Sequence, residues 1–412
     1  MSNPNVSLRR PAAQQRVLAA ALLALAGLLA LTLAAPIAAE AAKKRKRGVP
    51  VKVMTRNLYL GSSLSAGLNA TSLPELCDGA GVVVQEVDST NPAARMRAVA
   101  NEIRNKLPDL VGLQEVAAWY TQSPADGRPP QVLGGAGTFA TTVRHDFLQL
   151  LLKRLNQGKK RYKVVATSNE FEFETETNLD GLPTDSPNAS ASDCDDAEVD
   201  ARMLIRDVIL KRLKAGVRTS KPKTGNFVNQ LSLPLVGGIP FAVKRGWESV
   251  NAKVRGSRKF RFVNTHLEAF DSDATDNDMF NTSTSTTTTV SRGTVRKTQA
   301  EEIVNGPAKA KLPVVLVGDL NSNVPGVQTG DHQAFQAVLN AGFLRRSTQK
   351  PPSCCTDVLN PVFSEWDHVV DHILANRKRI KRIRSGVLGR AKVGGQLPSD
   401  HAAVWSVLRV PR

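Results

Sequence analysis

Side chains suited to acid–base and metal chemistry follow several apolar, strand-like runs of the sequence. Glu115 follows LVGLQ, His266 follows FVNT, and Asp319 follows VVLVG. Because a rigid sheet can deliver residues at its strand ends into one cleft, we expect these side chains to form a single site. A single carboxylate at a strand end is usually a salt-bridge partner. Several carboxylates, two histidines and two asparagines that all lie beside strand ends are hard to explain as ordinary surface residues. The full set is Asn57, Glu115, His266, Asp319, Asn321, Asp371, Asp400 and His401.

These residue types fit the hydrolysis of a phosphodiester. The ester is anionic, so a hard cation must offset the charge that develops at phosphorus and on the leaving oxygen. Carboxylate and amide oxygens suit Mg²⁺, with Mn²⁺ and Ca²⁺ as alternatives. A histidine held by an aspartate can serve the attacking water as a base. The sequence has neither a nucleophile-elbow serine nor a P-loop, which favours direct attack by water.

Six motifs, taken in order, resemble the endonuclease/exonuclease/phosphatase superfamily, which includes secreted deoxyribonucleases, AP endonucleases, sphingomyelinases and inositol-phosphate phosphatases. They are TRNLYLG (55–61), LVGLQEV (110–116), VNTHLEA (263–269), VVLVGDLNS (314–322), VVDHILAN (369–376) and LPSDHAAV (397–404). Each motif alone is weak, but the series is specific and covers nearly all of residues 51–410. The resemblance implies an α/β fold in a single domain: a four-layer sandwich of two packed mixed β-sheets flanked by helices, with the active site at one end.

The resemblance also implies the acid–base and phosphate-binding residues. His401 resembles the catalytic histidine, and Asp371 the carboxylate that orients it. Asp319 and Asn321 resemble the pair that orients the attacking water and contacts the phosphate. His266 resembles the histidine that donates to a phosphate oxygen, so Asn321 and His266 are expected to bind substrate as well.

Metal binding is implied for three further residues. Glu115 resembles the magnesium-binding glutamate, Asn57 the asparagine that helps to set the metal and its ligands, and Asp400 a further carboxylate at the metal. The chain departs from some nuclease relatives at Tyr59, where they have an acid, and this argues against a second metal ligand there. Asp207, in LIRDVIL, lies where relatives place a polar group on the substrate side, although a buried strand aspartate explains it equally well.

The elements that must position these residues can be read from hydrophobic periodicity. Strands are predicted over 51–57, 110–113, 162–166, 203–210, 259–264, 313–317, 369–375 and 402–408. Helices are predicted over 92–107, 144–156, 295–305 and about 332–341. Two polar stretches, about 178–200 and 271–292, are expected to be loops within the domain because they contain few core-forming residues.

The N-terminus has the pattern of an export signal. Basic residues precede a charge-free run, 17–39, and small residues follow it. We expect residues 1–42 to be an export signal or an N-terminal membrane anchor, 43–50 a basic linker and 51–410 the catalytic domain. Either interpretation places the catalytic domain outside the cytoplasmic membrane, secreted or at the cell surface.

The formal net charge of +18, from 55 Lys and Arg against 37 Asp and Glu, is distributed unevenly. Residues 168–200 hold eleven acids and no base, whereas Arg377–Lys392 holds eight bases and no acid. That block could track a nucleic-acid backbone or contact an anionic surface, so a nucleic-acid substrate is slightly preferred. Sphingomyelin-like lipids and inositol phosphates are the alternatives, and no obligate protein partner is inferred. A non-enzymatic binding module is disfavoured because it would not need the polar set.

The four cysteines form an even count, as expected for disulfides in an exported protein. Cys354 and Cys355 are adjacent, and neighbouring cysteines seldom bond to each other because the ring is strained. We therefore expect each of them to pair with Cys77 or Cys194, with the connectivity open.

Overall fold

The computed structural model describes residues 48–129, 135–179, 194, 197–214, 216–234, 236, 240–270, 294–326, 332–348, 350–362, 364, 366–376 and 380–412. Residues 49–411 form one compact unit. The expected export segment, most of the basic linker, most of the loop at 178–200 and all of the loop at 271–292 lie outside the described residues. Among the described residues, no helix is long and apolar enough to span a membrane.

The larger of the two main sheets has the strand order β15-β16-β1-β2-β6-β3-β4, and β5 also pairs with β6. β1 runs parallel to β2 and antiparallel to β16, so the ends of β1 and β2 lie beside the start of β16. The strands are β1 (Val49–Asn57), β2 (Leu110–Gln114), β3 (Ala118–Gln122), β4 (Thr142–Asp146), β5 (Tyr162–Thr177), β6 (Val199–Arg212), β15 (Lys381–Leu388) and β16 (Ala403–Val410).

The smaller main sheet has the order β13-β14-β12-β11-β10-β7, and β8 and β9 form a separate hairpin. β12 runs parallel to β11 and antiparallel to β14, which again brings two strand ends beside one strand start. The strands are β7 (Arg218–Asn226), β8 (Leu231–Pro234), β9 (Pro240–Val243), β10 (Gly246–Lys253), β11 (Phe260–His266), β12 (Val314–Asp319), β13 (Leu344–Arg345) and β14 (Asp371–Ala375).

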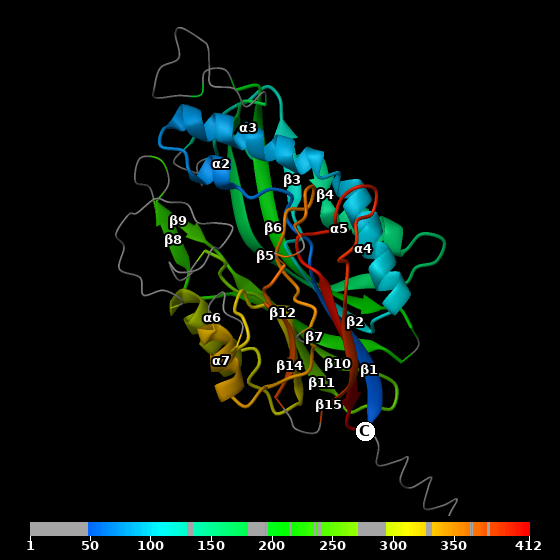
Figure 1. The fold of residues 1–412 in the computed structure, drawn as a ribbon. Helices are drawn as coiled ribbons and strands as arrows, with labels where there is room; N and C mark the ends of the chain where they lie inside the picture. The colour runs from blue at the N-terminus through cyan, green and yellow to red at the C-terminus, as the bar shows by residue number, and fades with distance from the viewer. Residues whose placement is uncertain are drawn as a thin grey trace, which may run out of the picture. The chain divides into compact units, whose positions relative to one another are not determined.

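Three buried apolar clusters define four layers (Figure 1). Val53 and Phe262 belong to the cluster between the two sheets. Met96 belongs to the cluster that packs α3, α4 and α5 on the larger sheet, and Phe335 to the cluster that packs α6 and α7 on the smaller sheet. The predicted four-layer α/β sandwich is therefore confirmed. The helices are α2 (Ser65–Leu68), α3 (Leu73–Ser89), α4 (Pro92–Lys106), α5 (Phe147–Leu155), α6 (Thr294–Asn305) and α7 (Gln333–Asn340).

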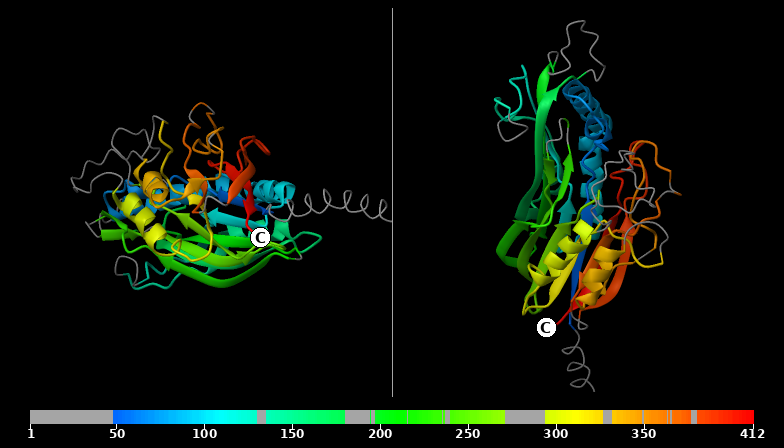
Figure 2. Two further views of the ribbon diagram at one scale, coloured as in Figure 1. Left: turned by 90° about the horizontal axis from the view of Figure 1, so that it is seen from below. Right: turned by 90° about the vertical axis from the view of Figure 1, so that its left-hand side faces the viewer.

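The larger sheet extends beyond the smaller one. In the right-hand view of Figure 2, the green strands β5 and β6 rise with the blue helix α3 past the yellow and orange helices α6 and α7. Both strands are long, with 16 residues in β5 and 14 in β6. This extension gives the end of the sandwich an additional wall made of α2, α3, β5 and β6.

Several sequence-based predictions need correction. β6 begins at Val199, inside the stretch expected to be a loop, and β5 continues to Thr177 rather than ending near 166. The helix expected from 144 begins at Phe147, because 142–146 pair with β3 as strand β4. Helix α3, which forms one side of the additional wall, has no counterpart among the predicted elements.

The disulfide prediction is wrong. Cys77 pairs with Cys194, and Cys354 pairs with its neighbour Cys355. The fold explains why Cys77 and Cys194 do not pair with Cys354 and Cys355. Cys77 lies on α3 in the additional wall, whereas the Cys354 backbone pairs with His368 just before β14.

Candidate active site

The strand registers bring the predicted residues to one end of the sandwich. On the smaller sheet, Asp319 at the end of β12 pairs with His266 on β11 and with Asp371 at the start of β14. On the larger sheet, Asn57 ends β1, and Glu115 directly follows the neighbouring strand β2. The two sheets therefore face each other across a set of carboxylates, as the strand-end pattern predicts.

His401 lies two residues before β16 and is held by Asp371. Its Nδ1 is 2.9 Å from Oδ2 of Asp371, and its Nε2 is 3.5 Å from Oδ2 of Asp319. Burial opposes a charge on the ring, but three carboxylates, led by Asp371, outweigh it and hold the pKa of His401 well above its usual value. Because the aspartate fixes the proton on Nδ1, Nε2 is the nitrogen that can exchange a proton with water or substrate.

Asn57 arranges two carboxylates from its place at the end of β1. Its Nδ2 donates to Oε1 of Glu115 at 2.9 Å and to Oδ2 of Asp319 at 3.1 Å. Its Oδ1 accepts the backbone N–H of Tyr59, and Oε2 of Glu115 accepts the N–H of Leu60 at 2.8 Å. Asn57 therefore positions two carboxylates through its Nδ2, while its Oδ1 already accepts a backbone hydrogen bond.

His266 faces the same carboxylates from the smaller sheet, but in the opposite protonation state. Its Nδ1 is 3.2 Å from a guanidinium nitrogen of Arg245, and its Nε2 is 3.7 Å from Oδ2 of Asp319. Burial and the nearby cations, first Arg245, lower the pKa of His266 well below its usual value. Since a guanidinium can only donate, Nδ1 accepts and the single ring proton is left on Nε2, facing the site. Nδ2 of Asn321, which donates to the Leu267 carbonyl, lies 3.1 Å from that nitrogen. Both groups are then donors, so they do not bond each other, and both can donate to an acceptor bound in the site.

Three residues beside the carboxylates have left-handed backbone conformations. Tyr59, Glu115 and Asn321 have φ values of 58°, 52° and 45°. Each follows a strand that ends at the site, and for residues other than glycine this conformation is uncommon. Strain of this kind persists where surrounding contacts over-determine it, often at functional sites. The Leu60 and Tyr59 amides that hold Glu115 and Asn57 belong to one of these turns.

The sequence pattern of the Endonuclease/Exonuclease/phosphatase family matches residues 79–401. That range holds most of the polar set, and its strands and helices build the four layers. The chain belongs to this family. Members of the family are hydrolases that act on phosphate esters, and they generally use divalent metals. No curated protein matches the chain in sequence.

Solved structures with a similar fold include other proteins of the family. A family protein from Bacteroides thetaiotaomicron is 14% identical, with 88% of this chain and 96% of that chain covered and a TM-score of 0.49. A mannosyl-6-phosphatase from the same organism is 14% identical, with 87% and 99% covered and a TM-score of 0.46. Truncated TDP2 from Caenorhabditis elegans is 15% identical, with 88% and 99% covered and a TM-score of 0.42.

The donor set fits the divalent cation that the family uses. Glu115, Asp319 and Asp400 offer carboxylate oxygens, which suit Mg²⁺, Mn²⁺ or Ca²⁺ better than a soft metal, and ligand atoms of Asp319, Asp371 and His401 lie within 4.8 Å of one another. Burial, opposed by His401 and supported by Glu115, raises the pKa of Asp400 to about 6. Oδ1 of Asp371 is buried without a hydrogen-bond partner. Carboxylates crowded at this density are stabilised by a bound cation, with Glu115 and Asp400 as its predicted ligands.

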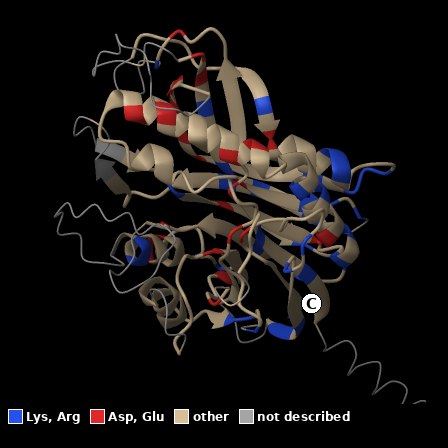
Figure 3. Ribbon diagram, turned by 45° about the horizontal axis from the view of Figure 1, so that its top comes forward, with Lys and Arg blue, Asp and Glu red and all other residues tan. Residues whose placement is uncertain are grey.

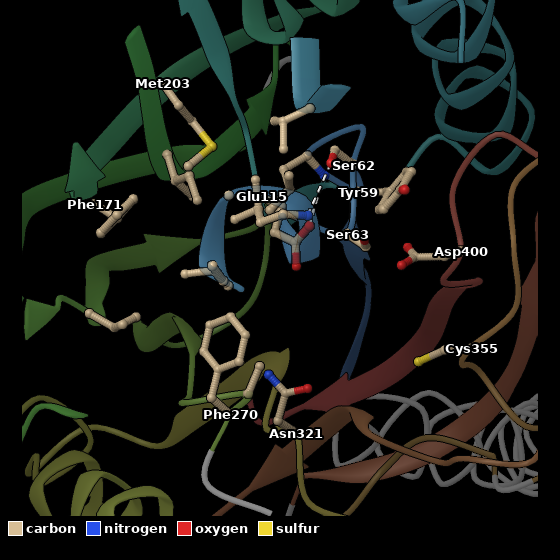
Figure 4. A pocket seen from close by; sticks show the side chains of 18 of the residues that line it. Tyr59, Ser62, Ser63, Glu115, Phe171, Met203, Phe270, Asn321, Cys355 and Asp400 are labelled. Atoms are coloured by element: carbon tan, nitrogen blue, oxygen red, sulfur yellow. Dashed lines mark hydrogen bonds between the residues drawn. The ribbon is translucent and has the colours of Figure 1, made fainter. Parts of the chain in front are cut away.

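A cavity of about 480 Å³ opens from these residues (Figure 4). Glu115, Asn321, Asp400 and His401 lie along its polar side. In Figure 4, Phe171 and Met203 lie on the opposite side from Asp400 and Cys355, with Glu115 between them. The site is therefore one cavity with a catalytic side and an apolar side.

Sequence reasoning missed several residues of the site. Arg95 of α4 is buried and donates to the backbone carbonyls of Leu58, Tyr59 and Pro398, so it ties the turn after β1 to the segment before His401. A buried arginine gives no periodic signal in a helix, so nothing in the sequence pointed to it.

Sequence reasoning also gave no indication of Arg245, or of Cys354 beside His401, as residues of the site. Arg245 precedes β10, a strand that the hydrophobic pattern did not show. The sulfur of Cys354 lies 3.3 Å from Nε2 of His401 and covers one side of that nitrogen.

Asp207 does not line the cavity. It is fully buried between the sheets, where its carboxylate, Glu170 and Glu248 approach within 4.8 Å of one another. Burial is the main cause that raises the pKa of all three, to about 8 for Glu170. The place of Asp207 gives no support to its predicted contact with substrate.

Proposed function

We propose that this chain is a divalent-metal-dependent phosphodiester hydrolase in which water attacks phosphorus directly. The observation that carries the proposal is the His401 ring, held by Asp371 at 2.9 Å, with Nε2 turned to Asp319 at 3.5 Å. A binding module has no need of a histidine whose tautomer is fixed by a buried carboxylate. Among the described cavity-lining residues, Cys354 lies 3.3 Å from His401, but its sulfur is bonded to Cys355 and is not a free nucleophile, and the Ser62 and Ser63 hydroxyls bond Glu86 and Ser65.

The acid–base pair is formed by His401 and Asp319. Asp319 accepts from Asn57 and from the Asn321 backbone, which fixes its carboxylate while Oδ2 faces His401. Because the two groups lie within 3.5 Å, they share the work of orienting water and returning a proton to the leaving oxygen. A cation held by Glu115 and Asp400 would supply charge neutralisation at phosphorus.

His266 and Asn321 suit the phosphate itself. The Nε2–H of His266 points between Glu115 and Asp319, at 3.9 and 3.7 Å, where a bound phosphate oxygen would be placed to accept it. A donor already in position stabilises charge as it develops, without reorganisation. We therefore propose His266 and Asn321 as substrate-binding residues, the role that the family resemblance implies for them.

Hydrolysis of bis-p-nitrophenyl phosphate with Mg²⁺ tests the proposal. A chelator should abolish the activity, and His401→Ala should lower kcat by roughly 10²- to 10⁴-fold, the usual size of a general acid–base contribution. His145→Ala is the matched control, because His145 pairs with Asp88 on the surface. Activity that survives both chelation and His401→Ala would exclude the mechanism.

Charge alone favours nucleic acid slightly ahead of lipid and inositol phosphates, but the described residues of the basic block do not line the cavity, so charge does not decide the substrate. We also propose export of the chain, supported by the order of basic, apolar and small residues in 1–42. Recovery of activity outside the expressing cell, and N-terminal sequencing of that protein, would test export.

A further inference from the structure

The cavity is far more apolar than a phosphate requires. Its wall beyond Glu115 is built from side chains of α2, α3, β3, β5 and β6 and of the turn after β1. These are Leu60, Leu64, Leu68, Leu76, Val83, Val84, Trp119, Phe171, Phe173, Met203 and Ile205. About 480 Å³ lies within the range of small-molecule sites, roughly 300–1,000 Å³. A phosphate and a cation fill only the catalytic side, so the apolar side is available for another part of the substrate.

Charge near the cavity argues against a polyanion on the apolar side. The described lining residues include two cations, Arg245 and Arg296, and both are buried. Arg245 contacts His266 and Glu268, and Arg296 donates to the Glu268 and Ala269 carbonyls. A groove that tracks a nucleic-acid backbone presents exposed Lys and Arg instead.

Helix α3, which supplies one wall of the cavity, carries acids and no basic residue. The acids are Glu75, Asp78, Glu86 and Asp88. Figure 3 shows these acids as red bands along the helix, while the basic residues gather elsewhere. A phosphate backbone crossing this wall would be repelled.

The polar groups on the apolar side are too few to read a nucleobase. The Ser62 hydroxyl donates to Glu86 and the Ser63 hydroxyl bonds Ser65, so the buried Thr175 hydroxyl, which has no partner among the described residues, is left to bond a ligand. A nucleobase enclosed there would have polar atoms without hydrogen-bond partners, which costs free energy. An alkyl chain has no polar atoms and avoids this cost. Leucine, valine, isoleucine and methionine also outnumber aromatic residues in this wall.

We propose that the cavity binds an aliphatic chain esterified to the reacting phosphate, so that the substrate is an alkyl or lipid phosphodiester. This inference rests on the proposed function and names its substrate class. The chain would run from phosphorus at Glu115 and His401 past Phe171 and Met203, between α3 and the extended strands β5 and β6. Both a soluble alkyl ester and a membrane lipid carry such a chain.

A series of alkyl p-nitrophenyl phosphodiesters, from methyl to octyl, tests the proposal with the full chain and Mg²⁺. Each buried methylene is expected to raise kcat/KM on the order of two- to fourfold until the cavity is full. Ala80→Phe places a ring into the cavity from α3. It should lower the octyl-to-methyl ratio of kcat/KM at least tenfold, and the smaller Ala80→Leu should shorten the preferred chain. Val82→Phe adds the same ring to α3 at a position outside the cavity lining, and should leave the ratio unchanged.

The outcomes separate the inference from the function on which it rests. If no ester of any length is hydrolysed with Mg²⁺, Mn²⁺ or Ca²⁺, both fail. If hydrolysis depends on His401 but the series is flat, or if Ala80→Phe leaves the ratio unchanged, the inference alone fails. Plasmid DNA cleaved with a higher kcat/KM than the octyl ester also overturns it.

Vesicles of phosphatidylcholine distinguish the two sources of the chain. Cleavage of vesicle lipid together with a rising ester series supports a membrane lipid. A rising ester series with intact vesicles supports a free alkyl phosphodiester, and both results uphold the aliphatic site.

Discussion

His401 and His266 face the same carboxylates from the two sheets, yet they are held in opposite protonation states. His401 has three carboxylates around it, and His266 has Arg245 against Nδ1. The raised pKa of His401 favours the charged ring, which can give a proton, while the lowered pKa of His266 keeps that ring a neutral donor. The two histidines therefore have different roles in the same site. Arg245 is the residue that fixes the protonation state and tautomer of His266.

Arg245→Met should expose that role. Without the guanidinium, neutral His266 can carry its proton on either nitrogen, so a fraction of the enzyme loses the donor at Nε2. We expect kcat/KM to fall on the order of 10- to 100-fold above pH 7, in line with the loss of one preorganised donor. The defect should shrink only well below about pH 6.5, because burial still lowers the pKa of His266 in the variant and the ring takes up a second proton, which restores the donor at Nε2, only in acid.

Arg245→Lys is the matched control, because it keeps a buried cation that only donates. It should recover most of the activity and a pH profile like that of the wild type. Thermal melting must accompany the kinetics, since Arg245 also lies 3.6 Å from buried Glu268. A loss for Arg245→Met that is equal at all pH values would indicate a structural role only.

His372, adjacent to the catalytic aspartate, is expected to control stability in acid. Its ring packs on Phe335, its Nε2 lies 2.9 Å from the Ser322 carbonyl, and its Nδ1 is buried without a partner. Burial lowers the pKa of His372 to about 4, against the opposing effect of the Ser322 hydrogen bond. The unfolded chain binds this proton near pH 6.5 and the folded chain does not, so stability present above that pH is lost as pH falls towards 4.

The loss from this one group approaches about 3 kcal/mol by pH 4. His372→Gln keeps an N–H donor and cannot titrate, so its free energy of unfolding should fall less steeply between pH 6.5 and 4. Urea denaturation at several pH values measures the difference. Parallel curves for the two proteins would show that His372 is not the group responsible.

At the scale of elements, the sequence predicted the strands that carry the catalytic side and, on the apolar side, β6 and only the first part of β5. The catalytic strands, such as β2 and β12, are buried on both faces and read as continuous apolar runs. β5 continues through FEFETET, whose alternation of phenylalanine and glutamate is a strand pattern, although the predicted strand ends near 166.

Helix α3 was missed for a related reason. Its start has a clear signal, since Ser72 caps the N–H of Glu75 and Glu75 reaches back to Thr71. The segment beyond it contains glycine and several valines, which are weak helix formers, so local propensity did not support the helix. Tertiary packing of its apolar face on the sheet stabilises it instead.

The Cys77–Cys194 disulfide should stabilise this wall. It joins α3 to the segment before β6 and closes a separation of 117 residues. Removing a native disulfide typically costs about 2–5 kcal/mol. Cys77→Ser with Cys194→Ser should therefore lower the melting temperature and raise KM for long-chain esters more than for the methyl ester. Equal KM changes for all esters would show that the bond does not support the apolar side.

For the whole molecule, sequence charge predicted a polyanion partner but could not say where the charge lies relative to the site. β15 pairs with β16 so that Leu388 lies opposite Ala403, close to His401, and Lys381 lies opposite Arg409 at the far end. The exposed basic residues of β15 are at that far end. The basic edge and the apolar cavity are therefore separate features of the described fold, and the first is suited to holding an anionic surface while the second takes the reacting ester.

Because the basic edge and the cavity are separate, salt and mutations of the edge should affect DNA binding and cleavage of a soluble ester differently. A triple variant with Lys381→Gln, Arg382→Gln and Arg384→Gln removes three exposed charges from β15. For plasmid DNA, the slope of the logarithm of the binding constant against the logarithm of the salt concentration should become less steep by about 2.7. Each lost phosphate contact accounts for about 0.9 of this change, and the variant loses three. Cleavage of the soluble octyl ester should change less than about twofold over roughly 50–200 mM salt, because that ester does not reach the edge. If the triple variant impairs the soluble ester as much as it impairs DNA binding, the basic edge belongs to the catalytic cavity and the separation is wrong.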